Sequence, residues 1–151
     1  MEGVDENLVF APATELSKLI ASKDVSPVEI TPLYLDRIDS LDVKLNSYLT
    51  VTSDLALESA RKAEKSVVAG DELGPLRGIP ISIKDLQMTK GVKTTGGSLA
   101  YKDRVPDADC AVVERVLSAG AIMLGKTNSP EFGLLGANEN RLGDPCRNPW
   151  N

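Results

Sequence analysis

A lysine at the end of a short apolar run is the first residue whose type and position could do chemistry. In the run 78–85, three isoleucines alternate with other residues, which is the pattern of a strand in or near a core. Lys84 ends this predicted strand, and Asp85 follows it. Ligands bind at the carboxyl ends of strands in open α/β sheets, so Lys84 is a candidate site residue. The simpler interpretation is that Lys84 reaches solvent and Asp85 caps a turn.

The chain contains no histidine, and this narrows the chemistry open to it. Histidine is the usual general base, a common metal ligand and the usual partner of a nucleophilic serine or cysteine. Any base in this chain must therefore be a lysine, an aspartate, a glutamate or a tyrosine. The two cysteines, Cys110 and Cys146, lie 36 positions apart and lack the spacing of metal ligands. We expect neither a metal site nor a disulfide scaffold.

A second lysine lies in a segment with the spacing of a phosphate-binding loop. Gly120, Gly125, Lys126 and Thr127 match the pattern of a glycine, four residues, then Gly-Lys-Thr. A phosphate loop needs a strand before its first glycine and a helix directly after its lysine. Here a predicted helix precedes Gly120 and the four intervening residues are apolar. We therefore expect a strand, not a nucleotide site.

The loop over 91–98 is rich in small residues, which lets the backbone approach another group closely. Within it, Gly96, Gly97 and Ser98 could present a nucleophilic serine, whose activator would have to be a lysine. The alternative, which we favour, is a turn whose serine caps or bonds the backbone.

Helix caps and hydrophobic periodicity predict the elements that position these residues. Ser26, Pro27 and Glu29 form a strong helix start, because Ser26 can cap and Glu29 completes a capping box. Expected helices run over about 14–22, 26–40, 53–69 and 107–119, with a further short helix after Ser129. Thr14, Ser26 and Ser53 are the expected caps of the first three. Gly70 is expected to end the third helix and Gly120 the fourth. Expected strands run over 47–51, 79–84 and 121–124.

The order of these elements predicts the topology. A strand, a helix and a strand follow one another from Ile81 to Leu124, so we expect a right-handed parallel crossover. The first ten residues are expected to form a loose leader, and 71–77 a turn-rich approach to the strand that ends in Lys84.

Length and composition bound the class of protein. A chain of 151 residues with 42% apolar and 26% charged residues is ordinary for one soluble domain or part of one. No apolar run reaches the roughly 18 residues that a membrane helix needs, and the start lacks the pattern of a secretory signal. We expect a cytoplasmic protein. A net charge of −5 without a basic run argues against nucleic acid as its main partner.

Several separated motifs resemble the amidase signature family. They are the segments 74–85, 94–98, 119–121, 125–133 and 147–150, in that order, preceded by 26–29 and 37–38, which look like the family's N-terminal helices. The implied fold class is α/β, the N-terminal part of that family's mixed sheet flanked by helices. Residues 1–151 would form part of a single amidase domain, with a helical leader over about 13–70 and the start of the α/β core over about 74–151.

The resemblance implies an amide hydrolase with a Ser-Ser-Lys triad and no cofactor, in which Lys84 matches the catalytic lysine. The substrate would be a small-molecule amide. A lysine acts as a base only when neutral, and the ordinary lysine pKa of about 10.4 leaves well under 1% neutral at pH 7. Burial lowers a lysine pKa, so such a base needs dry surroundings. The segment 132–135, with Gly133 and Leu134, would border the substrate pocket, or would simply be a buried helix end.

The sequence departs from the family's pattern at its end. In the family a glycine-serine loop with the bridging serine follows the Asn-Pro-Trp segment, here 148–150, and the nucleophile lies further on. We therefore interpret the chain as an N-terminal fragment, inactive alone. One alternative is a non-catalytic fragment that forms a homodimer or associates with a missing C-terminal half. A further alternative is the glutamine-hydrolysing component of an amidotransferase, although 95–98 and 129–131 look more like stand-alone amidases.

Overall fold

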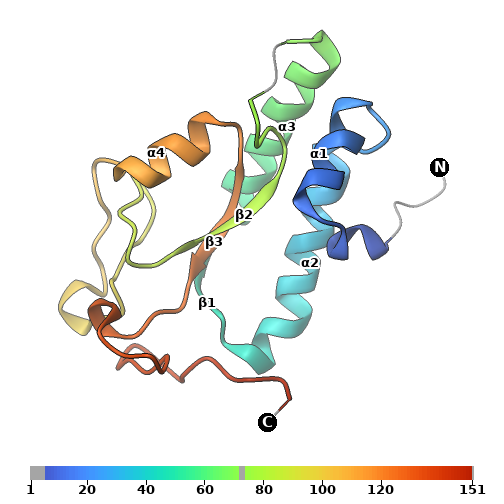
Figure 1. The fold of residues 1–151 in the computed structure, drawn as a ribbon. Coiled ribbons are helices and arrows are strands. Elements are labelled where there is room, and N and C mark those ends of the chain that lie inside the picture. Colours follow the sequence, from blue (N-terminus) through green and yellow to red (C-terminus); the bar gives the residue numbers. More distant parts are fainter. Residues whose placement is uncertain (1–5, 72–73, 151) are drawn as a thin grey trace. The chain divides into compact units, whose positions relative to one another are not determined.

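The protein is an α/β structure, described by a computed structural model over residues 6–71 and 74–150 (Figure 1). Its elements are η1 (Glu6–Phe10), α1 (Ala13–Ala21), α2 (Pro27–Leu45), β1 (Tyr48–Val51), α3 (Ser53–Ala69), β2 (Pro80–Lys84), η2 (Leu99–Tyr101), α4 (Ala111–Ser118), β3 (Ile122–Thr127) and η3 (Glu131–Gly133). The predicted helices and strands all exist, in the predicted order. Residues 1–5 of the expected leader and 72–73 of the turn-rich approach lie outside the described residues.

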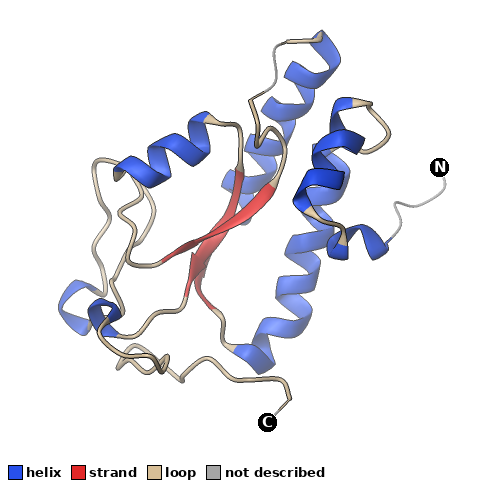
Figure 2. Ribbon diagram, viewed as in Figure 1, coloured by secondary structure: helices blue, strands red, loops and turns tan. Residues whose placement is uncertain are grey.

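The three strands form one sheet in the order β1-β3-β2 (Figure 2). β1 pairs antiparallel with β3, with Tyr48 opposite Thr127. Along β2 and β3, the Ile122 amide donates to the Ile79 carbonyl at one end and the Asp85 amide to the Thr127 carbonyl at the other. These two bonds follow the same sequence direction, so β2 and β3 are parallel, as the strand-helix-strand order predicts.

Local capping chemistry explains the start of α2. The Val28 amide donates to Ser26 Oγ at 3.0 Å, and the Ser26 amide donates to Glu29 Oε2 at 3.2 Å. This is the predicted capping box, and it satisfies two amides that the helix itself cannot. α2 continues five residues beyond its predicted end, to Leu45.

The other predicted caps were misplaced by one or two residues. Pro12 and Thr52 occupy the cap positions of α1 and α3, and neither makes a side-chain capping bond, so Thr14 and Ser53 are not caps. Gly70 does end α3, with φ of +76°. The first ten residues are also not all loose, because Glu6–Phe10 form a 3-10 helix.

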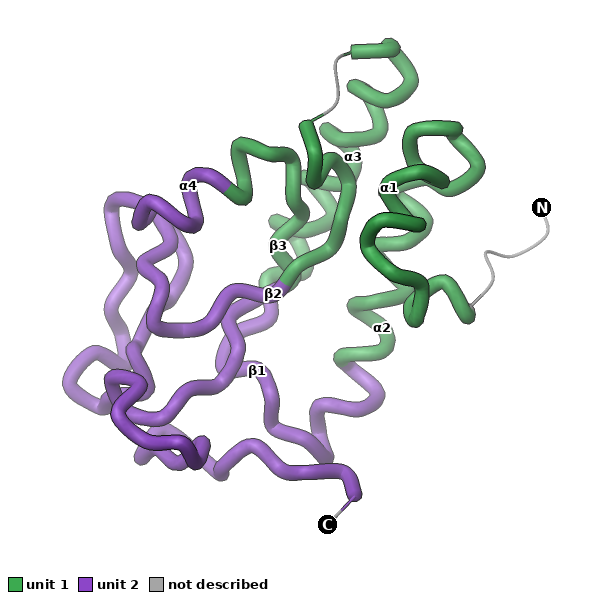
Figure 3. Tube along the Cα trace, viewed as in Figure 1, with its two compact units in different colours: residues 1–38, 52–81, 116–124 green, residues 39–51, 82–115, 125–151 purple. Residues whose placement is uncertain are grey.

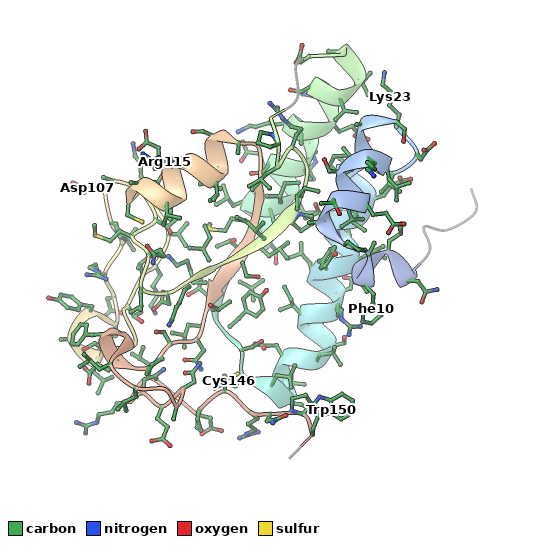
Figure 4. The ribbon with its side chains drawn as sticks, viewed as in Figure 1. Phe10, Lys23, Asp107, Arg115, Cys146 and Trp150 are labelled. Carbon is green, nitrogen blue, oxygen red and sulfur yellow. The ribbon has the colours of Figure 1, made fainter. Side chains whose placement is uncertain are left out.

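The predicted start of α4 at about residue 107 was wrong. The helix begins at Ala111, and Asp107 lies in the loop before it (Figure 4). Asp109 Oδ1 accepts a hydrogen bond from the Lys90 amide at 2.6 Å, and the Cys110 amide donates to the Met88 carbonyl. These bonds to a distant loop hold residues 109 and 110 outside the helix.

The chain divides into two compact units (Figure 3). Unit 1 comprises residues 1–38, 52–81 and 116–124, and unit 2 comprises 39–51, 82–115 and 125–151. Unit 1 holds two apolar cores. One gathers buried side chains from α1, α2 and α3 around Ile20 and Ile30, and the other packs the alanine stripe of α3 against Leu35, Ile122 and Leu124.

Unit 2 contains β1, the ends of β2 and β3, and long connecting loops. Polar side chains rather than a large apolar cluster organise these loops, since Asp85, Thr94, Ser98, Lys126 and Asn128 are all buried. Among the described helices, none combines the length and apolarity that a membrane crossing requires.

Candidate active site

Lys84 is the last residue of β2, and its side chain is exposed. The Asp85 amide donates to the Thr127 carbonyl at 3.1 Å, which ties the end of β2 to the end of β3. The predicted position at a strand's carboxyl end is therefore observed. The dry surroundings that a lysine base needs are not supplied by the described residues.

The carboxylate of Asp85 anchors the glycine loop beside Lys84. Asp85 is fully buried, and its Oδ2 accepts hydrogen bonds from the Thr95 amide, at 2.9 Å, and from the Thr95 hydroxyl. The Gly96 amide donates to the Asp85 carbonyl at 3.0 Å. Asp85 Oδ1 is also buried but has no hydrogen-bond partner among the described residues. Asp85 thus does more than cap a turn, because it fixes a loop ten residues away.

The glycine loop interlocks with the segment around η3. Gly97 has φ of +69°, and a Cβ atom there would lie 2.5 Å from the Ser129 carbonyl oxygen, so any larger residue would force the backbone to shift. Ser98 is buried, donates from Oγ to Glu131 Oε1 at 2.6 Å and accepts from the Ala100 amide. The structural interpretation of Ser98, a turn serine that caps or bonds the backbone, is confirmed, because Ser98 caps η2 by accepting from the Ala100 amide.

Lys126 is the buried cation of unit 2, and sequence reasoning did not single it out as a site residue. Its side chain has an exposed fraction of 0%. Its ammonium donates to Thr89 Oγ1 at 2.7 Å, to Thr94 Oγ1 at 3.0 Å and to the Gln87 carbonyl. Three neutral oxygens thereby satisfy its three N–H donors, and together they shape the loop that follows Lys84.

Burial lowers the pKa of Lys126 from 10.5 to about 8. The negative charge of Asp85 opposes this change, as do Cys110 and Asp109 more weakly, while Arg104 reinforces it. The segment that resembled a phosphate loop is instead strand β3, and its lysine points into unit 2 toward neutral oxygens. The predicted strand over 121–124 ended before Lys126, whereas β3 runs to Thr127, so the sequence did not mark this lysine as part of the strand.

The predicted pocket residues lie in and after η3. Gly133 has φ of +72°, and a Cβ atom there would lie 2.7 Å from Leu86 Cδ1, so η3 packs close to the segment after Lys84. Leu134 is 79% exposed, which rules out a buried helix end. Phe132 has φ of 52°, unusual for a bulky residue. The residue is 51% exposed, and its ring lies edge-on to that of Tyr101. Whether Gly133 and Leu134 border a substrate pocket stays a prediction.

A cavity of about 240 Å³ in unit 1 is lined by α3, α4, β3 and Arg77. It contains none of Lys84, Gly133 and Leu134, so it is not the predicted substrate pocket. Within the described residues there is no cluster of three or more Cys, Asp or Glu side chains that could hold a metal ion.

The family model called Amidase matches residues 29–151. The chain belongs to the amidase signature family. It is 40% identical over 144 residues to a glutamyl-tRNA(Gln) amidotransferase subunit of Acidothermus cellulolyticus, covering 95% of this chain and 28% of that protein. The chain therefore spans less than a third of the length of this curated relative.

Two solved structures of the family share this fold. A bacterial aryl acylamidase of the amidase signature family has a TM-score of 0.87 at 32% identity, covering 93% of this chain and 30% of that one. A fatty acid amide hydrolase has a TM-score of 0.89 at 26% identity, covering 98% of this chain and 26% of that one. The predicted family and fold class are thus confirmed.

Proposed function

We propose that this chain supplies the N-terminal part of an amide hydrolase in which Lys84 is the catalytic base. Membership of the amidase signature family supports the reaction class. The observation that carries the proposal for Lys84 is its place at the carboxyl end of β2, where the bond from the Asp85 amide to the Thr127 carbonyl ties that strand end to β3. Because the chain spans under a third of its curated relative, the other catalytic groups are proposed to lie in sequence beyond this chain.

The proposed chemistry follows the family's Ser-Ser-Lys triad. A neutral Lys84 amine would accept a proton, through a bridging serine, from the serine that attacks the amide carbonyl. The same proton would then reach the departing amine, so that the lysine ends neutral. No metal or cofactor takes part in this scheme.

The proposal requires that Lys84 lose contact with water in the complete enzyme. Lys84 is exposed here, so polypeptide outside this chain would have to cover it. The Asp85 bonds to Thr95 and Gly96 fix the position of the backbone after Lys84. No described carboxylate forms an ion pair with Lys84, so none favours its charged form.

Lys84→Ala in the full-length gene product tests the base. We expect turnover of an amide substrate to fall at least ~100-fold, the usual contribution of a general base, with an unchanged unfolding midpoint. Lys93→Ala is the matched control, because Lys93 is also an exposed lysine of unit 2. Near-normal turnover of Lys84→Ala would refute the assignment.

A second candidate is the glutamine-hydrolysing component of an amidotransferase. It is favoured by the name of the curated relative, a glutamyl-tRNA(Gln) amidotransferase subunit, at 40% identity. A glutaminase assay of the full-length protein, with and without co-expressed neighbouring genes, separates the two candidates. Glutamine hydrolysis that depends on a co-purifying partner would support the amidotransferase, and hydrolysis of other amides by the isolated protein would support the stand-alone enzyme.

The chain alone is proposed to be inactive and to associate with a C-terminal half or with a second copy. Large apolar side chains that unit 2 leaves exposed support association, including Leu134, Leu135 and Trp150. Trp150, labelled in Figure 4, is 92% exposed. Mixing the chain with a separately made C-terminal half tests this. Regained amide hydrolysis would support a split enzyme, and failure to associate would count against it.

A further inference from the structure

Asn128 directly follows β3 and is almost completely buried, with 5% exposure. Its backbone amide donates to the Ser47 carbonyl at 2.7 Å, just before the start of β1. A buried side-chain amide must satisfy two N–H donors and an oxygen with two lone pairs, so its partners show what it holds together.

The side chain of Asn128 uses both of its polar ends. Its Nδ2 donates to the Asn46 carbonyl at 3.0 Å and, more weakly, to the Asp144 carbonyl at 3.5 Å. Its Oδ1 accepts from the Ser129 amide at 2.8 Å and from Asn140 Nδ2 at 2.7 Å. Two bonds thus stay near the sheet, and two reach the segment 140–147.

Further bonds fasten the same segment. Asn140 Nδ2 also donates to the Ser129 carbonyl, and Asn140 Oδ1 accepts from the Leu142 amide. Asn46 Nδ2 donates to the Asp144 carbonyl, and the Arg147 amide donates to the Leu45 carbonyl at 2.7 Å. None of residues 140–147 is buried, so hydrogen bonds rather than burial hold this stretch. Among the described side chains that bond it, Asn128 is the only buried one.

Asn128 lies at the same edge of the sheet as Lys84. β2 and β3 run parallel, and the Asp85 amide bonds the carbonyl of Thr127, the residue before Asn128. All of these residues belong to unit 2. Asn128 therefore joins the strand end beside Lys84 to a segment that follows Lys84 by more than 50 positions in the sequence.

We propose that Asn128 is a positioning residue, which fixes the segment 140–147 at the sheet edge that carries Lys84. The catalytic part of this inference rests on the proposed amide hydrolase. In that enzyme the polypeptide after this segment would approach Lys84, and Asn128 would fix how close it comes. Asn128 itself touches no reacting atom in this scheme.

Asn128→Asp tests the anchoring in the 151-residue chain without any activity assay. The substitution keeps the size and Oδ1 but turns the donor toward the Asn46 and Asp144 carbonyls into an acceptor. We expect hydrogen exchange of the Leu142 and Arg147 amides to accelerate at least tenfold, with the Ile122 amide unchanged as a reporter of the sheet.

Two further variants keep the test decisive if Asn128→Asp does not fold. Asn140→Asp removes the Nδ2 donor toward Asn128 Oδ1 and the Ser129 carbonyl but keeps the oxygen that accepts from the Leu142 amide. Exchange of the Arg147 amide should therefore accelerate. Asn148→Asp is the matched control, because Asn148 is exposed and bonds through its Oδ1 to the Trp150 amide, an interaction that a carboxylate keeps. Unchanged exchange of the Arg147 amide in Asn140→Asp would overturn the anchoring.

In the full-length enzyme, Asn128→Asp should lower kcat at least tenfold while KM stays within twofold. The positioning role would be overturned if Asn128→Asp loosened the segment 140–147 but left kcat normal, while Lys84→Ala still inactivated the enzyme. An enzyme that Lys84→Ala does not inactivate would instead refute the proposed function, while the exchange result would still decide whether Asn128 anchors the segment.

Discussion

The buried ammonium of Lys126 should give the protein an unusual dependence of stability on pH. The pKa of Lys126 is about 8 in the folded chain, because burial disfavours its charge, and about 10.5 in the unfolded chain. Between these values the unfolded chain holds a proton that the folded chain has released. The free energy of unfolding therefore rises with pH in this window.

The size of the rise follows from the two pKa values. Each pKa unit corresponds to about 1.4 kcal/mol, so Lys126 should add about 3 kcal/mol to the free energy of unfolding between pH 8 and pH 10.5. Below pH 8 both states bind the proton, and the contribution is flat. Other groups also titrate in this range, but they cancel in a comparison with Lys126→Met.

Urea unfolding followed by circular dichroism, in small pH steps across the window between the two Lys126 pKa values, measures this effect. The difference in unfolding free energy between the wild type and Lys126→Met should grow in favour of the wild type as the pH rises. Lys93→Met, which removes an exposed lysine of the same unit, should leave the slope of the wild type intact. Parallel curves for the wild type and Lys126→Met would refute the depressed pKa.

Three further changes test the local structure. Asp85→Asn should destabilise unit 2 by about 1–3 kcal/mol, because it weakens a buried charge-assisted pair of hydrogen bonds to Thr95. Hydrogen exchange of the Thr95 amide should accelerate, and an unchanged exchange rate would show that these bonds are unimportant. Gly97→Ala should cost about 1–3 kcal/mol in thermal unfolding, given its positive φ and a backbone oxygen 2.5 Å from the new Cβ, whereas Gly136→Ala, with open space around it, should be nearly neutral. Ser26→Ala should cost about 1 kcal/mol by loss of the capping box, and a melting temperature equal to that of the wild type would contradict this.

Features that depend on neighbouring residues could be predicted from the sequence. The capping box at Ser26 and the left-handed Gly70 at the end of α3 follow from chemistry within one helical turn. The strand that ends in Lys84 follows from the alternation of isoleucines along it. The start of α4 could not be predicted in this way, because Asp109 bonds the Lys90 amide, 19 positions away.

In the candidate site, too, local features could be predicted from the sequence and long-range contacts could not. The position of Lys84 was available from a local pattern, but the anchoring of its neighbour Asp85 to Thr95 depends on how a long loop folds back. The burial of Lys126 could not be predicted, because its three oxygen partners lie more than 30 positions earlier in the chain and leave no sign in the sequence around it. Family resemblance identified the reaction class, which no spacing in this chain could have supplied.

The left-handed backbone conformation of Phe132 means that selection for stability and selection for catalytic activity can favour different residues at this position. A phenylalanine at φ of 52° is strained by about 1–3 kcal/mol, and glycine or asparagine would adopt this conformation more easily. A library randomised at position 132 and sorted for heat resistance should therefore accumulate glycine and asparagine. The same library sorted for turnover would return an aromatic ring only if the working enzyme uses that ring.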